Sequence, residues 1–212
     1  PLVALLTSPS TEVKQSAADA LSMLSFKGPS TQLAIASGLV QLIGQGSADS
    51  QEQATQLLLH LSHDPVNCKA VAKAGAVPRL VQQMKGGGRT SVKAQELATA
   101  VLSNLAALEE CVKGIVQANG LRPVVSMLSS GSHAAAHAAA VLSAIAQSSV
   151  RNKRSILSEG GLVPLVNLLS KEQRPKAKAE AAGALKSLTS GQPQTQRAVA
   201  EQGAIKSLIH ML

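Results

Sequence analysis

Residues 96–120 read ELATAVLSNLAALEECVKGIVQANG, and this stretch decides the fold. Ala98, Leu102 and Leu105 occupy positions i, i+4 and i+7, so they form one apolar stripe along a helix. A short second helix follows and ends at Asn119-Gly120, a pair typical of a helix C-cap at positive φ. The stretch therefore predicts two helices, the first with a small Ala that lets a neighbouring helix approach closely.

The same Ala-x-x-x-Leu-x-x-Leu pattern occurs five times along the chain, once with Ile in place of the last Leu. Successive copies start 37, 44, 40 and 43 residues apart. The copies are Ala17/Leu21/Leu24, Ala54/Leu58/Leu61, Ala98/Leu102/Leu105, Ala138/Leu142/Ile145 and Ala181/Leu185/Leu188. Self-similarity at this period predicts stacked helical repeats, each covering the apolar face of the next.

Each copy is followed by a break that contains Gly or Asn. The breaks are SGLV at 37, GAVP at 75, NGLR at 119, GGLV at 160 and GAIK at 203. The distance from the end of a stripe to the break is 13 to 15 residues, whereas the distance from the break to the next stripe is 17 to 23. Length variation is thus confined to one connection per repeat, and we expect all insertions along one edge.

The repeated unit resembles the armadillo repeat, and its closest copy joins GAVPRLVQQM at 75–84 to residues 96–120. The resemblance implies an all-α fold: a right-handed α-solenoid (superhelix) of about five three-helix armadillo-type repeats, with the third helices lining a concave groove. We expect a single domain over residues 1–212, a segment of a longer chain. Its repeats would span residues 1–36 (partial), 37–74, 75–118, 119–159, 160–202 and 203–212 (partial).

Composition and charge limit the classes of function that the chain can have. The chain has no Trp, no Tyr and one Phe, so its core must be aliphatic and base-stacking platforms for nucleic acids are absent. No apolar run approaches the ~18 residues that cross a bilayer. Two cysteines give no disulfide framework, which favours an intracellular location, cytoplasmic or nuclear. Residues 150–212 hold ten Lys/Arg against four Asp/Glu, so the C-terminal third is basic.

The resemblance also implies where a partner binds. Nuclear-import adaptors with this fold hold an extended peptide with a ladder of Trp and Asn residues, which lie two and six residues after each stripe Ala in this register. The corresponding groove residues here are Asp19, Gln56, Ala100, Ala140 and Gly183, and then Met23, His60, Asn104, Ala144 and Ser187. Asn104 alone matches the ladder, so the resemblance does not carry over binding of nuclear-localisation signals.

A gradient of charge runs along the expected rim of the groove. The rim residues change from acidic to basic in the order Glu12, Asp49, Lys93, His133 and Lys176. The basic end is extended into a patch expected to attract acidic groups. Its members are Arg151, Lys153, Arg154, Lys171, Arg174, Lys176, Lys178 and Lys186.

Motifs for catalysis or metal binding are weak. His133 and His137 have the i, i+4 spacing of a metal pair, but the Glu of HExxH is replaced by Ala and no third ligand is evident. We therefore expect no catalytic residues, no metal and no cofactor, and a chain that is not an enzyme.

The leading hypothesis is a scaffold or adaptor that binds another protein, an extended peptide or a helix, in the concave groove. Its basic C-terminal end would favour an acidic stretch of the partner. Two alternatives stay open. One is the substrate-targeting domain of a larger enzyme such as a ubiquitin ligase. The other is a peripheral binder of anionic membranes or nucleic acid through the basic patch, of which nucleic acid has the weaker support because aromatic platforms are missing.

Overall fold

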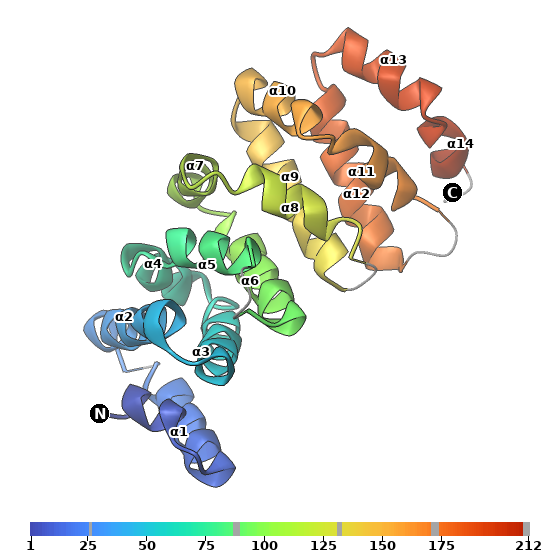
Figure 1. Ribbon diagram of the computed structural model, residues 1–212. Helices are drawn as coiled ribbons and strands as arrows, with labels where there is room; N and C mark the ends of the chain where they lie inside the picture. Colours follow the sequence, from blue (N-terminus) through green and yellow to red (C-terminus); the bar gives the residue numbers. More distant parts are fainter. Residues whose placement is uncertain (26, 87–89, 131–132, 171–173, 210–212) are drawn as a thin grey trace. The chain divides into compact units, whose positions relative to one another are not determined.

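The structure is a computed structural model that describes residues 1–25, 27–86, 90–130, 133–170 and 174–209. Within these residues every regular element is a helix (Figure 1). The helices cluster into two compact units, Pro1–Cys111 and Val112–Leu212, and the boundary falls inside α7. Over the same residues, none of the helices combines the length and the apolar character that spanning a membrane requires.

The N-terminal unit, residues 1–111, begins with a short 3-10 helix and contains three helices that carry the apolar stripe: α1, α3 and α6. Its elements are η1 (Val3–Thr7), α1 (Thr11–Leu24), α2 (Pro29–Gln45), α3 (Ala48–Leu61), α4 (Pro65–Lys73), α5 (Ala76–Met84), α6 (Val92–Leu105) and the start of α7 (Glu109–Gln117). The helices α4, α5 and α6 form one complete three-helix repeat.

The C-terminal unit, residues 112–212, contains the other two stripe helices, α9 and α12. Its elements are the rest of α7, then α8 (Leu121–Met127), α9 (His133–Ser148), α10 (Val150–Ser158), α11 (Leu162–Asn167), α12 (Pro175–Thr189), α13 (Pro193–Glu201) and α14 (Ala204–Ile209). Figure 1 shows α9 and α12 lying side by side, and α10, α11 and α12 repeat the three-helix pattern.

The predicted stripes form the core of both units. Every stripe residue is buried except Leu24, which is half-buried near the end of α1. Serine hydroxyls start three of the stripe helices in the N-terminal unit, because Ser10, Ser47 and Ser91 each accept a hydrogen bond from the N–H of the residue three positions later. Local capping and the apolar stripe therefore specify these helices together.

Four of the five predicted breaks have the expected backbone. Gly75, Asn119, Gly160 and Gly203 have φ values of 74°, 57°, 78° and 79°. This left-handed conformation is open to Gly and, at lower cost than for other residues, to Asn. At these four sites the prediction of a helix end is confirmed.

The break predicted at SGLV, residues 37–40, is wrong. α2 continues from Pro29 to Gln45 through this segment, so it joins two helices that are separate in other repeats and crosses the expected boundary at 36/37. Gly38 has another role there: a Cβ on it would come within 3.0 Å of Val3 Cγ2. The glycine allows η1 to pack closely on α2 instead of ending the helix.

The variable connection joins the second and third helices of a repeat, as between α5 and α6, α8 and α9, and α11 and α12. Residues 87–89, 131–132 and 171–173 of these connections lie outside the described residues, and Lys171 of the predicted basic patch is among them.

Candidate functional site

A polar groove of about 800 Å³ lies in the N-terminal unit, and we call it the N-terminal groove. It is lined by α1, α3 and the turn that leads into α4. The lining residues are Gln15, Ala18, Asp19, Ser22, Ser25, Gln53, Gln56, Leu57, His60, Leu61, His63, Asp64, Pro65 and Asn67. Helical periodicity produces the α3 wall, because Gln53, Gln56 and His60 recur on the side of the helix away from the buried Leu58.

The turn from α3 to α4 contributes the most constrained part of this groove. Asp64 is the N-cap of α4, and its Oδ1 accepts a hydrogen bond of 2.7 Å from the N–H of Val66. Pro65 occupies the first turn, where its missing N–H costs nothing. Asn67 follows and is only 4% exposed, yet its Oδ1 has no hydrogen-bond partner among the residues that the structure describes.

A smaller groove of about 520 Å³ lies in the C-terminal unit, and we call it the C-terminal groove. Its lining residues are Ser143, Gln147, Lys153, Gly183, Lys186, Ser187 and Ser190. Hydroxyl and amide groups of α9 and α12 are linked here: the Ser143 and Ser187 hydroxyls are 3.1 Å apart, and Gln147 Nε2 donates to each over 3.2 Å. This wall is polar and uncharged.

Two ammonium groups complete the C-terminal groove. Lys153 comes from α10, and its Nζ donates to the Ser190 carbonyl over 2.6 Å, which holds the side chain across the turn after α12. Lys186 comes from α12 itself. Between them Gly183 leaves the helix backbone bare, because a Cβ built on it would meet no atom within 4 Å. The groove therefore combines positive charge, hydroxyls and open space.

The structure brings some of the ten predicted groove residues together and not others. Asp19, Gln56 and His60 line the N-terminal groove, whereas Gly183 and Ser187 line the C-terminal groove. The other five line neither groove, namely Met23, Ala100, Asn104, Ala140 and Ala144.

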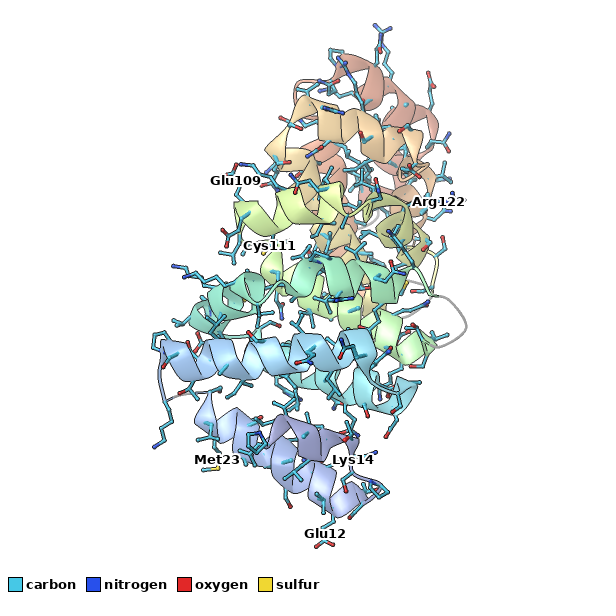
Figure 2. All side chains as sticks on the ribbon, turned by 60° about the vertical axis from the view of Figure 1, so that its left-hand side comes forward. Glu12, Lys14, Met23, Glu109, Cys111 and Arg122 are labelled. Atoms are coloured by element: carbon cyan, nitrogen blue, oxygen red, sulfur yellow. The ribbon has the colours of Figure 1, made fainter. Side chains whose placement is uncertain are left out.

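Those five have different environments. Met23 is 74% exposed and points away from the ribbon at the end of α1 (Figure 2). Ala100 is buried, and Ala140 and Ala144 are half-buried. Asn104, the single match to the ladder, donates its Nδ2 to Ser62 Oγ over 2.9 Å and thereby links α6 to the end of α3. Its amide nitrogen is engaged within the N-terminal unit.

The predicted basic patch is divided between two places. Lys153 and Lys186 line the C-terminal groove, and Arg151 and Arg154 share α10 with Lys153. The second group surrounds the start of α12, where Arg174 is the N-cap residue and Lys176 and Lys178 follow. The Arg174 guanidinium contacts the His133 imidazole at the start of α9. Twelve residues of helix separate Arg174 from Lys186, about 18 Å along the axis.

Sequence reasoning missed the α3–α4 turn. His63, Asp64 and Asn67 belong to no ladder position, so a search restricted to the third helices passes over them. The signal that would have found them is the Asp-Pro pair directly after a stripe, since it marks a helix start beside the end of a third helix.

The two cysteine thiols are buried and unreactive in character. Burial raises the pKa of the Cys68 thiol, and the Asp64 carboxylate adds to the rise. Burial likewise raises the pKa of the Cys111 thiol to about 11, with smaller contributions from Glu110 and Cys68. Both thiols therefore stay protonated near neutral pH, where the thiolate is the nucleophilic form.

Comparison with known proteins gives a consistent family signal. Residues 64–107 and 149–190 match the model described as Armadillo/beta-catenin-like repeat. The Arabidopsis thaliana protein named CELLULOSE SYNTHASE INTERACTIVE 3 is 24% identical over 181 residues. That match covers 82% of this chain and 8% of the Arabidopsis protein, so the chain spans a small part of its relative.

Solved structures with the same fold cover nearly the whole chain. An engineered protein (Target OR329) is 30% identical with a TM-score of 0.80, and the match covers 100% of this chain and 87% of that one. A designed armadillo repeat protein in complex with peptide (KR)4 is 24% identical with a TM-score of 0.78, over 99% and 89% of the two chains. A structure from work on the interaction between cadherin and beta-catenin is 19% identical with a TM-score of 0.82, and the match covers 98% of this chain and 40% of that one. The last two likenesses concern the fold alone.

Proposed function

The chain belongs to the armadillo repeat family, and we propose that it is a protein-binding scaffold whose grooves hold an extended segment of a partner protein. Neighbours with this fold include a designed protein bound to a peptide and a structure concerned with cadherin and beta-catenin. The name of the Arabidopsis relative describes interaction with cellulose synthase. These associations support protein binding as the activity, and the proposal assigns no catalytic step to the chain.

The observation that carries the proposal is the chemistry of the C-terminal groove. Lys153 and Lys186 line it together with the Ser143 and Ser187 hydroxyls, and none of the described residues that line it is acidic. Ammonium and hydroxyl groups donate hydrogen bonds to carboxylates, and charge-assisted hydrogen bonds are the stronger kind. The open backbone at Gly183 leaves room for a partner side chain. We propose that this groove holds an acidic residue of the partner.

The start of α12 supports the same preference. Arg174, Lys176 and Lys178 lie where the helix macrodipole is positive, and the first turn holds no acidic residue. Basic side chains at this end of a helix are unfavourable for its stability by a few tenths of a kcal/mol. We propose that they attract an acidic stretch of the partner.

Peptide selection tests the proposal. Random peptides displayed on phage and selected against the chain supply the probe, and a selected peptide is then titrated by fluorescence anisotropy. Gly183→Trp should lower its affinity by about tenfold or more, because the indole occupies the open space over α12. Glu201→Trp, an exposed position on α13 outside both grooves, is the matched control and should leave affinity unchanged.

Charge variants test the acidic preference. Lys186→Glu should weaken acidic selected peptides by about tenfold, and the effect should shrink in high salt. Charge reversal at Lys176 and Lys178 should slow association more than it speeds dissociation. Full affinity in Gly183→Trp would overturn the groove assignment. Tight binding to anionic liposomes or single-stranded DNA, lost by about 200 mM salt, would favour the electrostatic alternative instead.

A further inference from the structure

The turn between α7 and α8 contains a residue pair that occurs nowhere else in the chain, Asn119-Gly120. Asn119 has a φ of 57° and is the only residue other than glycine with a positive φ in the part of the chain that the structure describes. The helix ends at Gly75, Gly160 and Gly203 carry glycine in the same conformation. Among these four helix ends, the one after α7 therefore places a side-chain amide directly before a residue without a side chain.

The carboxamide of Asn119 is exposed, and no hydrogen bond to a described residue holds it. In contrast, the amides of Asn104 and Asn152 donate to serine hydroxyls over 2.9 and 2.7 Å. Asn167 is exposed as well, but the bulky Leu168 follows it. All five asparagines lie within the described residues, and Asn119 is the one that combines exposure, an unbonded amide and a following glycine.

We propose that Asn119 is a site of spontaneous deamidation, at a rate that the end of α7 controls. The Gly120 backbone nitrogen loses its proton to base and attacks Asn119 Cγ, so an N–Cγ bond forms, the Cγ–Nδ2 bond breaks and ammonia leaves. Glycine has no side chain to obstruct this attack, and asparagine is among the thermolabile residues. The product is a five-membered succinimide.

Water then opens the succinimide at one of its two carbonyl carbons. If the new N–Cγ bond breaks, residue 119 becomes aspartate. If the original peptide bond breaks, it becomes isoaspartate, in which the main chain runs through the former side chain. The sum of the steps converts asparagine and water into an acid and ammonia, so the reaction needs neither an oxidant nor an enzyme.

The hydrogen bonds at the end of α7 hold the attacking nitrogen. The Gly120 N–H donates to the Ile115 carbonyl over 2.9 Å, and the Asn119 N–H donates to the Val116 carbonyl over 3.1 Å. This pair of bonds is a Schellman motif, and Gly120 is buried within it. Attack on Cγ therefore requires the helix end to open, and helix ends open locally at a lower free energy than the whole chain.

Both products should weaken the turn. Aspartate places a negative charge at the C-terminal end of α7, where the helix macrodipole is already negative. Isoaspartate adds a methylene group to the main chain before Gly120, so the two bonds of the motif cannot keep their present geometry. Gly120 is also the N-cap residue of α8, and its carbonyl accepts a hydrogen bond from the Val124 N–H over 3.1 Å. The modification therefore acts on the end of one helix and the start of the next.

Mass spectrometry of the complete chain tests the reaction. The chain is incubated in a mildly alkaline buffer and digested, and each asparagine-containing peptide is compared with synthetic aspartate and isoaspartate standards. Asn119 should convert about tenfold or more faster than Asn167, which is exposed but precedes Leu168. Similar rates at the two asparagines would overturn the proposal, because the following glycine would then have no effect.

A synthetic peptide with the sequence of residues 113–124 measures the same reaction without the helix end. The peptide should convert about tenfold or more faster than the folded chain, because opening of the helix end precedes attack in the chain. In urea that unfolds the chain, the rate at Asn119 should rise to that of the peptide in the same solution. Equal rates in the peptide and the folded chain would overturn the control by the end of α7.

Two variants separate the effects of the products on stability. Asn119→Gly should fold normally, because other helix ends carry glycine at this φ, and incubation should leave its urea midpoint unchanged. The incubated parent should unfold at a lower urea concentration than the fresh parent. Asn119→Asp carries the charge without the extra methylene and should be destabilised less than the isoaspartate form. A converted parent as stable as the fresh one would overturn the effect on the turn. None of these measurements involves a partner, so their failure leaves the protein-binding function untouched.

Discussion

The third helices of the two units are built on the same stripe but approach their neighbours differently. α9 packs along α12 over much of its length, whereas α1 contacts α3 over a short stretch. Both helices carry buried alanines, including Ala134 and Ala138 in α9 and Ala181 in α12. Between α1 and α3 the corresponding space is lined by Gln15, Gln53 and other polar side chains.

The difference shows that neighbouring repeats built on one stripe can form grooves of different volume and lining. The groove in the C-terminal unit has a volume of about 520 Å³ and is lined by serines, Gln147, two lysines and Gly183. Longer polar side chains accompany a groove of about 800 Å³ in the N-terminal unit. One repeat template therefore supports two grooves of different volume and opposite charge, because the residues outside the stripe are not constrained by the core.

Substitutions in the apolar stripe, which both units share, should have the largest effect on stability. Leu102 in α6 and Leu142 in α9 occupy the same stripe position and are both fully buried. Leu→Ala at either should lower the free energy of unfolding by about 2–5 kcal/mol, through lost burial and the cavity that remains. Urea unfolding measures the loss, and Val92→Ala at an exposed position of α6 is the control. A loss well below 1 kcal/mol at either leucine would show that the two leucines do not occupy the same stripe position.

A second substitution tests the close approach of α9 and α12. Ala135, three residues before the stripe Ala of α9, is buried, whereas the same position of α6 holds Gln95, which is half-buried. Ala135→Gln should destabilise the chain by about 1–3 kcal/mol, because the longer side chain forces tightly packed helices apart. Gln95→Ala should change stability by less than about 0.5 kcal/mol. If the two substitutions change the thermal stability equally, the spacing of the helices does not differ between α6 and α9 in the way proposed.

Two glycines inside helices, one in each unit, should show smaller differences in stability when replaced by alanine. Gly183 in α12 faces open space, so Gly183→Ala should stabilise the chain by about 0.5–1 kcal/mol through the better helix propensity of Ala. Gly38 in α2 faces Val3 at 3.0 Å from a built Cβ, so Gly38→Ala should lose most of that gain or reverse it. The midpoints of urea denaturation of the two variants measure this difference. If Gly38→Ala stabilises the chain as much as Gly183→Ala does, then η1 can move away from α2 without loss of stability.

Alkaline pH gives the smallest effect and acts on a thiol of the N-terminal unit, since residues 112–212 contain no cysteine. Folding raises the pKa of the Cys111 thiol from 9.0 to about 11, so the folded chain keeps a proton that the unfolded chain releases. The corresponding stability is complete well below pH 9, begins to fall as pH approaches 9 and is lost progressively as pH rises to 11. Between pH 8 and 9 the loss should be about 0.4 kcal/mol. Cys111→Ala should reduce this pH dependence of the unfolding free energy in urea titrations, and the buried Cys68 thiol should account for the part that remains. An unchanged dependence would contradict the prediction.

The stripes, the helix ends and the repeat period could be predicted from sequence because they depend on local interactions. Gly75 and Gly160 end helices through their own backbone freedom, and Leu102 is buried wherever an Ala-x-x-x-Leu-x-x-Leu helix finds a neighbour. The break expected at residue 37 was wrong because Gly38 serves a contact with Val3, which is 35 residues away in the chain. A glycine selected for a distant contact and one selected for a turn look the same in a sequence.

The candidate site depended on tertiary structure to a greater extent. The register placed Asp19, Gln56 and Gly183 on the third helices, and the structure then assigned them to two separate grooves. By itself the sequence determined the all-α repeat fold, its apolar core and the basic C-terminal third, since each follows from residue type and spacing. Only the tertiary structure decided that Asn67 and Asp64 join Asp19 in one groove, and that Lys153 joins Lys186 in the other. These residues belong to different helices, and their proximity is set by how closely the helices pack.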